Sequence, residues 1–376
     1  MNKLKIMTVI GTRPEIIKLS RIIPKLDLFF DHLLVNTSQN FDYELNKIFF
    51  KDLNIRKPDV ELNIQAKSAA KTIAKVIDEI DTLIKKHRPD AFLILGDTNS
   101  CLSCISAKRN KVPIFHLEAG NRCFDLRVPE EINRKIIDHV SDIHLTYSSI
   151  AREYLLNEGL PKNQIIKVGS PMKEVVNHYD SKIKKSKILQ KLKITKGQYI
   201  LVSLHREENV DDVNILKKFL KILNYLKESQ KKKLVVSTHP RTRKNLENLD
   251  FKKTPKITFS KPFSFTDYIK LQLDAAYVMS DSGTITEEAS ILNFPAINLR
   301  ETHERPEGNE EASVISTSLN LEEIIQAIDI LKTQKRGNQR NIGLIKDYDT
   351  DNVSEKVVRI ILSYTDFVNK YSWKKY

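Results

Sequence analysis

The chain has 376 residues, of which 40% are hydrophobic and 29% charged, and its formal net charge is +14. This length predicts two domains of ordinary size, and the composition is that of a soluble globular protein. No stretch approaches the roughly 20 apolar residues that a membrane span needs, and the N-terminal apolar run is too short for a signal peptide. We therefore expect a cytoplasmic protein with no membrane partner.

The positive charge raises the alternative of a nucleic-acid-binding protein. The excess lysines lie in mixed, periodic segments such as 184–193 and 227–233, without interleaved aromatic residues that could stack on bases. We interpret these segments as solvated helix faces and expect no nucleic-acid partner. A nucleic-acid-binding protein would instead bind any duplex in a salt-sensitive manner. The positive field favours anionic small-molecule substrates.

Short runs rich in Val, Ile and Leu alternate with segments of helical periodicity. The runs are 5–10, 33–37, 91–96, 113–118, 143–148 and 165–170, and then 199–205, 233–239, 256–260, 275–281, 295–300 and 312–317. Such alternation predicts α/β architecture, with parallel sheets covered by helices on both faces. Two sets of six predict two doubly wound, Rossmann-like domains, 1–172 and 173–359, that face a cleft. A C-terminal helix at about 360–376 is expected to pack back on the first domain.

Carboxylates follow two of the predicted strands. Asp97 ends the run LILGD, Glu118 ends PIFHLE, and the pair Glu130-Glu131 comes just after Val128-Pro129. Acids at the carboxyl ends of buried strands are poorly placed for packing and well placed for moving protons in a site beside the sheet. The alternative is that Asp97 caps the following helix and that the glutamate pair lies on a solvated first turn.

Two strand-to-helix turns could bind anions. In GTRPEIIK (11–18), the first helical turn has free N–H groups, Arg13 adds a fork of donors, and Lys18 lies about one turn further on. The alternative is a plain connection with a salt-bridged arginine. In SDSGTITEEAS (280–290), hydroxyls and amides again meet a helix start, and Glu287 or Glu288 could reach ribose hydroxyls or serve as a cap.

Common cofactor and metal motifs are missing from the sequence. The chain has neither a G-x-G-x-x-G fingerprint nor a phosphate loop, so we expect no nucleotide cofactor bound by either mode. Cys101 and Cys104 have redox spacing but lie inside a predicted helix, and metal binding would lack a second ligand pair. We expect these thiols to be buried packing residues and expect no metal. His205, in LHREEN at a strand end, could act as an acid, a base or a phosphate contact, although a lone histidine more often makes a structural hydrogen bond.

Taken together, the motifs GTRPEIIK, LGDTNS, HLEAGNR, PEEINR, HREEN, SDSGTITEEAS and HERPEG resemble, in this order, the non-hydrolysing UDP-N-acetylglucosamine 2-epimerase family. The resemblance runs from residue 5 to about residue 355. That family resembles glycosyltransferases of the two-Rossmann-domain type (GT-B). The resemblance to the epimerase family implies an isomerase that removes the C2 proton, expels UDP to give a 2-acetamidoglycal, and adds UDP back with protonation from the other face. It also implies a homodimer that serves surface polysaccharide synthesis and needs neither metal nor nicotinamide.

The resemblance assigns roles to individual positions. Those that match catalytic residues of the family are Asp97, Glu118, Glu130 and His205. Those that match contacts to the UDP-sugar are Arg13, Lys18, Arg206, Tyr268, Ser282, Gly283, Glu288 and Arg305. The resemblance does not assign which carboxylate takes the proton and which returns it.

Several positions depart from the commoner pattern of the family: Ser38, Asn40, Glu207 and Phe263. The first two lie near the place where some members bind a second UDP-GlcNAc as activator, so the sequence leaves that regulation open. The departures resemble the branch that makes UDP-N-acetyl-L-fucosamine from its talo epimer. Interconversion of UDP-GlcNAc and UDP-ManNAc is the main hypothesis, and the 6-deoxy-L sugar pair is the alternative. A glycosyltransferase of the same fold, which retains the C2 hydrogen, is the alternative of another class.

Overall fold

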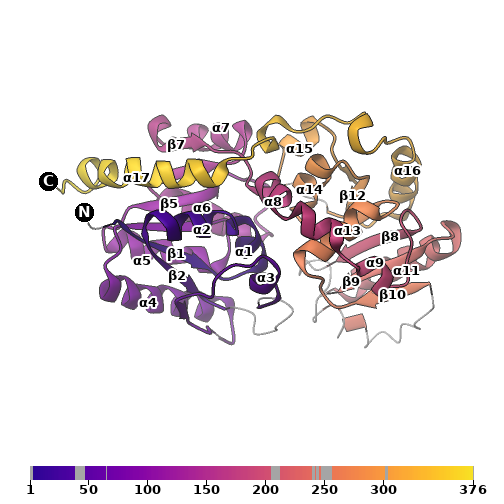
Figure 1. Cartoon of the computed structure of the whole chain (residues 1–376), viewed down its shortest axis with the longest axis horizontal. Helices are drawn as coiled ribbons and strands as arrows, with labels where there is room; N and C mark the ends of the chain where they lie inside the picture. Colours follow the sequence, from indigo (N-terminus) through magenta and orange to yellow (C-terminus); the bar gives the residue numbers. More distant parts are fainter. Residues whose placement is uncertain are drawn as a thin grey trace. The chain divides into compact units, whose positions relative to one another are not determined.

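The computed structural model describes residues 3–38, 47–64, 66–204, 212–238, 242, 245–246, 256–300 and 304–375 (Figure 1). The chain divides into two compact units, Met1–His178 with Asp347–Tyr376, and Tyr179–Lys346. The first therefore extends six residues beyond the predicted boundary at 172, and the chain returns to it at Asp347. Among the described residues, no helix is both long and apolar enough to cross a membrane.

The first unit is built on a seven-stranded parallel sheet of order β3-β2-β1-β4-β5-β6-β7. Its strands are β1 (Lys5–Ile10), β2 (Asp31–Asn36), β3 (Val60–Glu61), β4 (Ala91–Leu95), β5 (Ile114–Ala119), β6 (Ile143–Thr146) and β7 (Ile165–Lys167). The central strands are buried along their whole length, as expected for a sheet covered on both faces. The chain reverses direction along the sheet between β3 and β4, which makes β1 and β4 the neighbours at the topological switch point.

Helices cover this sheet and carry the connections between its strands. They are α1 (Arg13–Leu19), α2 (Ile22–Phe29), α3 (Lys47–Asp52), α4 (Ala69–His87), the 3-10 helix η1 (Asn99–Ser103), α5 (Cys104–Arg109), α6 (Pro129–Val140), α7 (Ser149–Asn157), η2 (Lys162–Gln164), α8 (Met172–Lys185), η4 (Lys346–Tyr348) and α17 (Val353–Tyr371). The last helix runs along α2, as Figure 1 shows in yellow over indigo. The side chains of Lys25 and Glu355 pair between these two helices, and Ser354 Oγ donates to Glu174.

The second unit has a six-stranded parallel sheet of order β10-β9-β8-β11-β12-β13. Its elements are β8 (Tyr199–Leu204), β9 (Lys233–Thr238), β10 (Ile257–Ser260), β11 (Val278–Ser280), β12 (Ala296–Asn298), β13 (Ile315–Ser316), α9 (Ile188–Lys191), α11 (Val213–Ser229), α13 (Phe265–Asp274), α14 (Ile285–Leu292), α15 (Glu307–Glu310), α16 (Leu321–Leu331) and η3 (Gly337–Gln339). Two apolar clusters, one on each face, fill the space between sheet and helices. The predicted fold class, two doubly wound parallel sheets, is confirmed.

Gly120, directly after β5, is a sensitive position of the first unit. Its φ is +82°, and a Cβ there would lie 2.3 Å from the backbone oxygen of Ala151. Because neither backbone can yield easily, we expect Gly120→Ala to lower the free energy of unfolding by about 3 kcal/mol or more. Gly159→Ala is the matched control, since φ is +86° there and a Cβ would meet no described atom within 4 Å. With both variants measured by urea titration, Gly159→Ala should lower the free energy of unfolding by only about 1 kcal/mol. Equal losses would contradict the steric account.

Candidate active site

The carboxyl ends of β1, β4 and β5 meet at one edge of the first sheet. Leu95 pairs with Leu117, so Asp97, just after β4, and Glu118, near the end of β5, lie at nearly the same level of neighbouring strands. Gly11 and Thr12 follow β1 on the other side of β4. The structure thus brings together, at the switch point, two of the three carboxylates that the sequence singled out.

Asp97 is held by helix α6. Its Oδ2 accepts from Arg134 Nε at 2.7 Å, and its backbone oxygen accepts from Asn133 Nδ2 at 2.9 Å. The Asp97 side chain remains 22% exposed, so it is oriented without being sealed off. The N-cap residue of η1 is Thr98, so the capping role considered for Asp97 does not apply to this helix. Arg134 and Asn133 were not singled out by the sequence analysis.

Glu118 has an unusual backbone and a buried cationic partner. Its φ is +69°, a left-handed conformation that costs a residue with a Cβ about 1 kcal/mol or more, and the pairing of β5 with β6 shifts register here. Its Oε2 lies 2.5 Å from Lys18 Nζ. Lys18 is 2% exposed and lies 5.3 Å from the ring centre of Tyr147. The lysine predicted to contact UDP is therefore in direct contact with a predicted catalytic carboxylate.

The pair Glu130-Glu131 lies at the start of α6, as predicted, but the two residues differ in environment. Glu131 is fully buried, accepts from the backbone N–H groups of Cys123 and Phe124, and pairs with Arg134 at 2.9 Å. Burial would raise the pKa of the Glu131 carboxyl, but the amide of Cys123 and the Arg134 guanidinium lower it below its usual value. Glu131 therefore fixes the loop before α6. Glu130 is half-buried in the first turn of that helix.

The turn after β1 is occupied by its own carboxylate. Glu15, fully buried, accepts from the N–H groups of Gly11 and Thr12 at 2.7 and 2.6 Å and from Thr98 Oγ1 at 2.8 Å. Burial raises the pKa of Glu15, against these hydrogen bonds. The amides of Gly11 and Thr12 are thus already used, and anion binding by the N–H groups of the helical turn that follows stays a prediction. The Thr-x-x-Glu spacing of a capping box was the available signal. Arg13, half-buried, lies 5.8 Å from the ring centre of Phe49.

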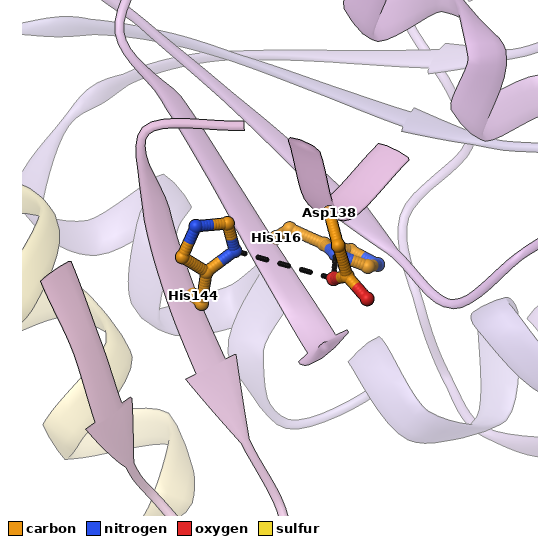
Figure 2. A group of neighbouring side chains, drawn as sticks. All are labelled: His116, Asp138 and His144. Atoms are coloured by element: carbon orange, nitrogen blue, oxygen red, sulfur yellow. Dashed lines mark hydrogen bonds and ion pairs between the residues drawn. The ribbon is translucent and has the colours of Figure 1, made fainter. Parts of the chain in front are cut away.

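Beneath the carboxylates lies a buried cluster of His116, Asp138 and His144, whose ligand atoms all fall within 4.8 Å of one another (Figure 2). Such a set could hold a metal ion, but His116 and Asp138 are already hydrogen-bonded. Asp138 Oδ1 accepts from His116 Nδ1 at 2.8 Å, and Asp138 Oδ2 accepts from Arg122 Nη1 at 2.7 Å. The buried guanidinium already supplies the positive charge that a cation would bring. We interpret His116, Asp138 and Arg122 as a hydrogen-bonded network, and His144 lies beside it, 4.0 Å from Asp138. Cys101 and Cys104 nearby are buried free thiols, as predicted.

His144 makes the stability of the chain sensitive to acid. Burial lowers the pKa of its imidazole from 6.5 to about 4, although Asp138, 4.0 Å from Nδ1, opposes the shift. Between pH 6.5 and 4 the unfolded chain therefore binds a proton that the folded chain refuses. We expect this residue to remove about 3 kcal/mol from the free energy of unfolding as the pH falls through that window. His144→Leu should flatten the pH dependence measured by urea titration by that amount. An unchanged slope would contradict the assignment.

In the second unit, the turn after β11 gathers several predicted contacts. Ser282 Oγ lies 3.0 Å from Thr284 Oγ1, and Arg305 Nε donates to the backbone oxygen of Gly283 at 3.2 Å. Arg305 Nη2 lies 3.3 Å from Glu287. Glu288, 6% exposed, accepts from Gln272 Nε2 at 2.5 Å. The turn is thus built around Arg305, which holds both the loop and the helix that follows.

Three other predicted residues belong to the second half of the chain. Tyr268, on α13, packs against the core cluster of the second unit. His205 and Arg206 lie outside the described residues, so their predicted roles remain predictions.

Comparison with known proteins shows the family of the chain. The sequence model of the family described as "UDP-N-acetylglucosamine 2-epimerase" matches residues 25–362. A structure titled UDP-N-acetylglucosamine 2-epimerase from Rickettsia bellii is 50% identical with a TM-score of 0.92, and the match covers 100% of both chains.

The names of two further relatives state which UDP-sugar each binds or acts on. The Methanocaldococcus jannaschii UDP-GlcNAc 2-epimerase, solved with UDP-GlcNAc and UDP, is 33% identical with a TM-score of 0.90, covering 96% of this chain and 100% of that one. A UDP-2,3-diacetamido-2,3-dideoxy-D-glucuronate 2-epimerase from Pseudomonas aeruginosa is 33% identical over 80% of this chain and 84% of its own length. The predicted family is confirmed: the chain belongs to the UDP-N-acetylglucosamine 2-epimerase family of isomerases.

Proposed function

We propose that the chain interconverts UDP-GlcNAc and UDP-ManNAc as a non-hydrolysing 2-epimerase. The observation that carries this proposal is the pair of carboxylates at the ends of neighbouring strands. Asp97 and Glu118 are each partly exposed and each in contact with a cation, Arg134 and Lys18. Inversion at C2 requires proton transfer on both faces of the sugar, and two oriented carboxylates from different strands meet that requirement. The activity in the names of the M. jannaschii and R. bellii relatives agrees with it.

The reaction proceeds by elimination and re-addition. One carboxylate removes the C2 proton while the C1–O bond breaks, and the bonding electrons leave with the β-phosphate oxygen of UDP to give a 2-acetamidoglycal. UDP then attacks C1, and a second carboxylic acid delivers a proton to the opposite face of C2. Protons and electrons balance without an external oxidant. Because the C2 hydrogen is only weakly acidic, stabilisation of the leaving diphosphate must accompany proton removal.

We assign the proton transfers to Asp97, Glu118 and Glu130. The contact with Lys18 favours the ionised form of Glu118, and the contact with Arg134 does the same for Asp97. Glu130, at the first turn of α6, is the third candidate acid. His205 and Arg206 are proposed to stabilise the leaving diphosphate, a role that rests on the sequence motif alone.

The UDP portion is proposed to bind through the turn after β11. Ser282 and Gly283 offer amide and hydroxyl donors, Arg305 supplies positive charge beside Gly283, and Glu288 can reach ribose hydroxyls. Arg13, Lys18 and Tyr268 complete the proposed contacts. Titration calorimetry with UDP tests this assignment, because removal of the Arg305 guanidinium should weaken UDP binding without changing the fold of the first unit.

Product analysis distinguishes this function from a glycosyltransferase. Incubated with UDP-GlcNAc alone, the chain should form UDP-ManNAc without any acceptor. An ¹⁸O label placed in the C1–O–P bridge should scramble into the non-bridging β-phosphate positions, because the C1–O bond breaks and reforms. A glycosyltransferase would form no epimer and would need an acceptor to consume the donor. Epimer formation without scrambling would contradict the elimination mechanism.

The sugar is the part of the proposal that needs its own test. The P. aeruginosa relative acts, by its name, on a different UDP-sugar at a similar level of identity. The residues Ser38 and Phe263 depart from the commoner pattern in the direction of the L-fucosamine branch. The UDP-GlcNAc and 6-deoxy-L-talo substrates should be assayed side by side. We expect the larger kcat/KM with UDP-GlcNAc, and the reverse would reassign the substrate while leaving the reaction unchanged.

We also propose a homodimer in the cytoplasm. The first unit exposes large apolar side chains around the start of α6, with Phe124 66%, Leu126 65% and Ile132 48% exposed. Single exposed apolar side chains are common on a monomer, but several in one region of the surface indicate an interaction site. Light scattering coupled to size-exclusion chromatography tests the proposal, with a mass of twice 43.4 kDa expected.

A further inference from the structure

The segment around Glu118 is held from both sides by one buried carboxylate on α6. Asp138 accepts from His116 Nδ1, from the backbone N–H of Gly120 at 3.2 Å, and from Arg122 Nη1. These three donors lie two residues before, two residues after and four residues after Glu118. Asp138 itself is 0% exposed and 20 residues further along the chain. A single side chain therefore fixes the backbone on both sides of a residue whose φ is +69°.

His116 extends this network to the neighbouring strand. Its Nδ1 faces the Asp138 carboxylate, and its Nε2 lies 2.8 Å from the backbone oxygen of Gly96. The carbonyl can only accept, so Nε2 carries a hydrogen. Asp138 also accepts from Arg122 and from a backbone amide, so it is ionised and Nδ1 carries a hydrogen as well. His116 is therefore an imidazolium, and Figure 2 shows its ring beside the Asp138 carboxylate. Gly96 directly precedes Asp97.

The lowered pKa of Asp138 agrees with this geometry. Burial would raise the pKa of its carboxyl, but the charge and hydrogen bond of His116 and the charge of Arg122 hold it well below its usual value. Arg122 is in turn fixed by Glu158, which accepts from Nε and Nη2 at 2.7 Å each. The charges of the four groups sum to zero, which explains how they remain ionised inside the protein.

We propose that Asp138 is a positioning residue of the epimerisation: through Gly120 and Arg122 it holds Glu118 in its left-handed conformation, and through His116 it fixes the peptide that carries Asp97. Two of the three proposed proton-transfer groups, Asp97 and Glu118, thus share one buried anchor. The inference rests on the proposed function, because it explains how carboxylates from two strands keep the separation that a two-sided reaction at C2 needs. Misplacement by about 1 Å is enough to cost about 100-fold in rate.

The test compares Asp138→Asn with Asp142→Asn. Asp142 is also buried, at 3% exposed, and also pairs with a cationic side chain, Lys108, at 2.5 Å. It accepts from the N–H of Ile114, at the opposite end of β5 from Glu118. We expect Asp138→Asn to lower kcat by about 10- to 100-fold, with KM and the Kd of UDP within about threefold of wild type. Asp142→Asn should lose stability and keep kcat within about threefold.

Two histidine variants separate the arms of the network and serve if Asp138→Asn does not fold. His116→Asn keeps a donor toward Asp138, and His116→Gln keeps one toward Gly96. Each should lower kcat, and the double variant of Asp138→Asn with His116→Gln should lose no more than the larger single loss, because both break one network. ¹⁵N spectra of wild-type His116 should show a proton on both ring nitrogens, whatever the activity.

The outcomes are distinguishable. An active wild type with unchanged kcat in folded Asp138→Asn overturns the inference, as does an equal loss of kcat in Asp142→Asn or a singly protonated His116. A wild type that forms no epimer from any UDP-sugar tested overturns the proposed function instead.

Discussion

Replacing Asp97 by asparagine is expected to lower kcat for epimerisation by about 10²- to 10⁴-fold, the range that a general acid or base contributes. The carboxamide keeps the size of the side chain. Its oxygen can still accept the hydrogen bond that Arg134 Nε donates to Asp97 Oδ2 at 2.7 Å in the native chain. It cannot take up or deliver a proton. Steady-state kinetics with UDP-GlcNAc measure the loss.

The same variant should bind UDP nearly as well as the wild type. Asp97 lies in the first unit, and its native partners are protein groups of α6. Calorimetry with UDP and a thermal melt therefore provide the controls. A folded variant with kcat within about tenfold of wild type would remove Asp97 from the proton-transfer groups. Loss of folding would return it to a structural role.

Replacing Lys18 by methionine is expected to affect both stability and activity. The ammonium is 2% exposed and lies 2.5 Å from Glu118, which is itself 11% exposed. Removing one member of such a pair leaves the other charge poorly solvated, so we expect a loss of about 3 kcal/mol in the free energy of unfolding. The kcat should fall about 100-fold, because Glu118 loses the partner that orients and ionises it.

Lys5→Met is the matched control for this change. Lys5 also pairs with a carboxylate, Asp31, but at 3.5 Å and with side chains 36% and 60% exposed. Exposed pairs contribute about 0 to 1 kcal/mol, so this variant should be nearly neutral in both measurements. If Lys18→Met raised KM and left kcat unchanged, Lys18 would act only through its proposed contact with the UDP portion, and its role on Glu118 would be contradicted.

The strands were predictable because buried parallel strands are continuous apolar runs. All twelve predicted runs overlap a strand. Among the described strands, the one that no run predicted is β3, Val60–Glu61. Two residues, one of them charged, give no periodic signal, and this edge strand exists because its backbone pairs with Val35 and Asn36. Strand order likewise follows from tertiary packing, although the handedness of parallel connections limits the choices.

Part of the candidate site was also predictable. Asp97 and Glu118 each follow an apolar run, and strands that are consecutive in such a fold tend to be neighbours. The partners of these carboxylates were not predictable, because contacts such as that of Lys18 with Glu118 join residues 100 positions apart. The left-handed conformation of Glu118 left no trace in the sequence either, since glycine would be the usual residue there. The anchor Asp138 looked like one polar residue on an amphipathic helix.

The central claim is that protons enter and leave C2 of a UDP-N-acetylhexosamine at the ends of β4 and β5. Incubation of wild-type chain with UDP-GlcNAc in D₂O, followed by mass spectrometry and proton NMR of both epimers, tests it most directly. We predict one deuterium per molecule, located at C2, in UDP-GlcNAc and UDP-ManNAc alike, with none incorporated by Asp97→Asn within the same time. Epimers that retain the C2 hydrogen, or a wild type that incorporates no deuterium, would contradict the account.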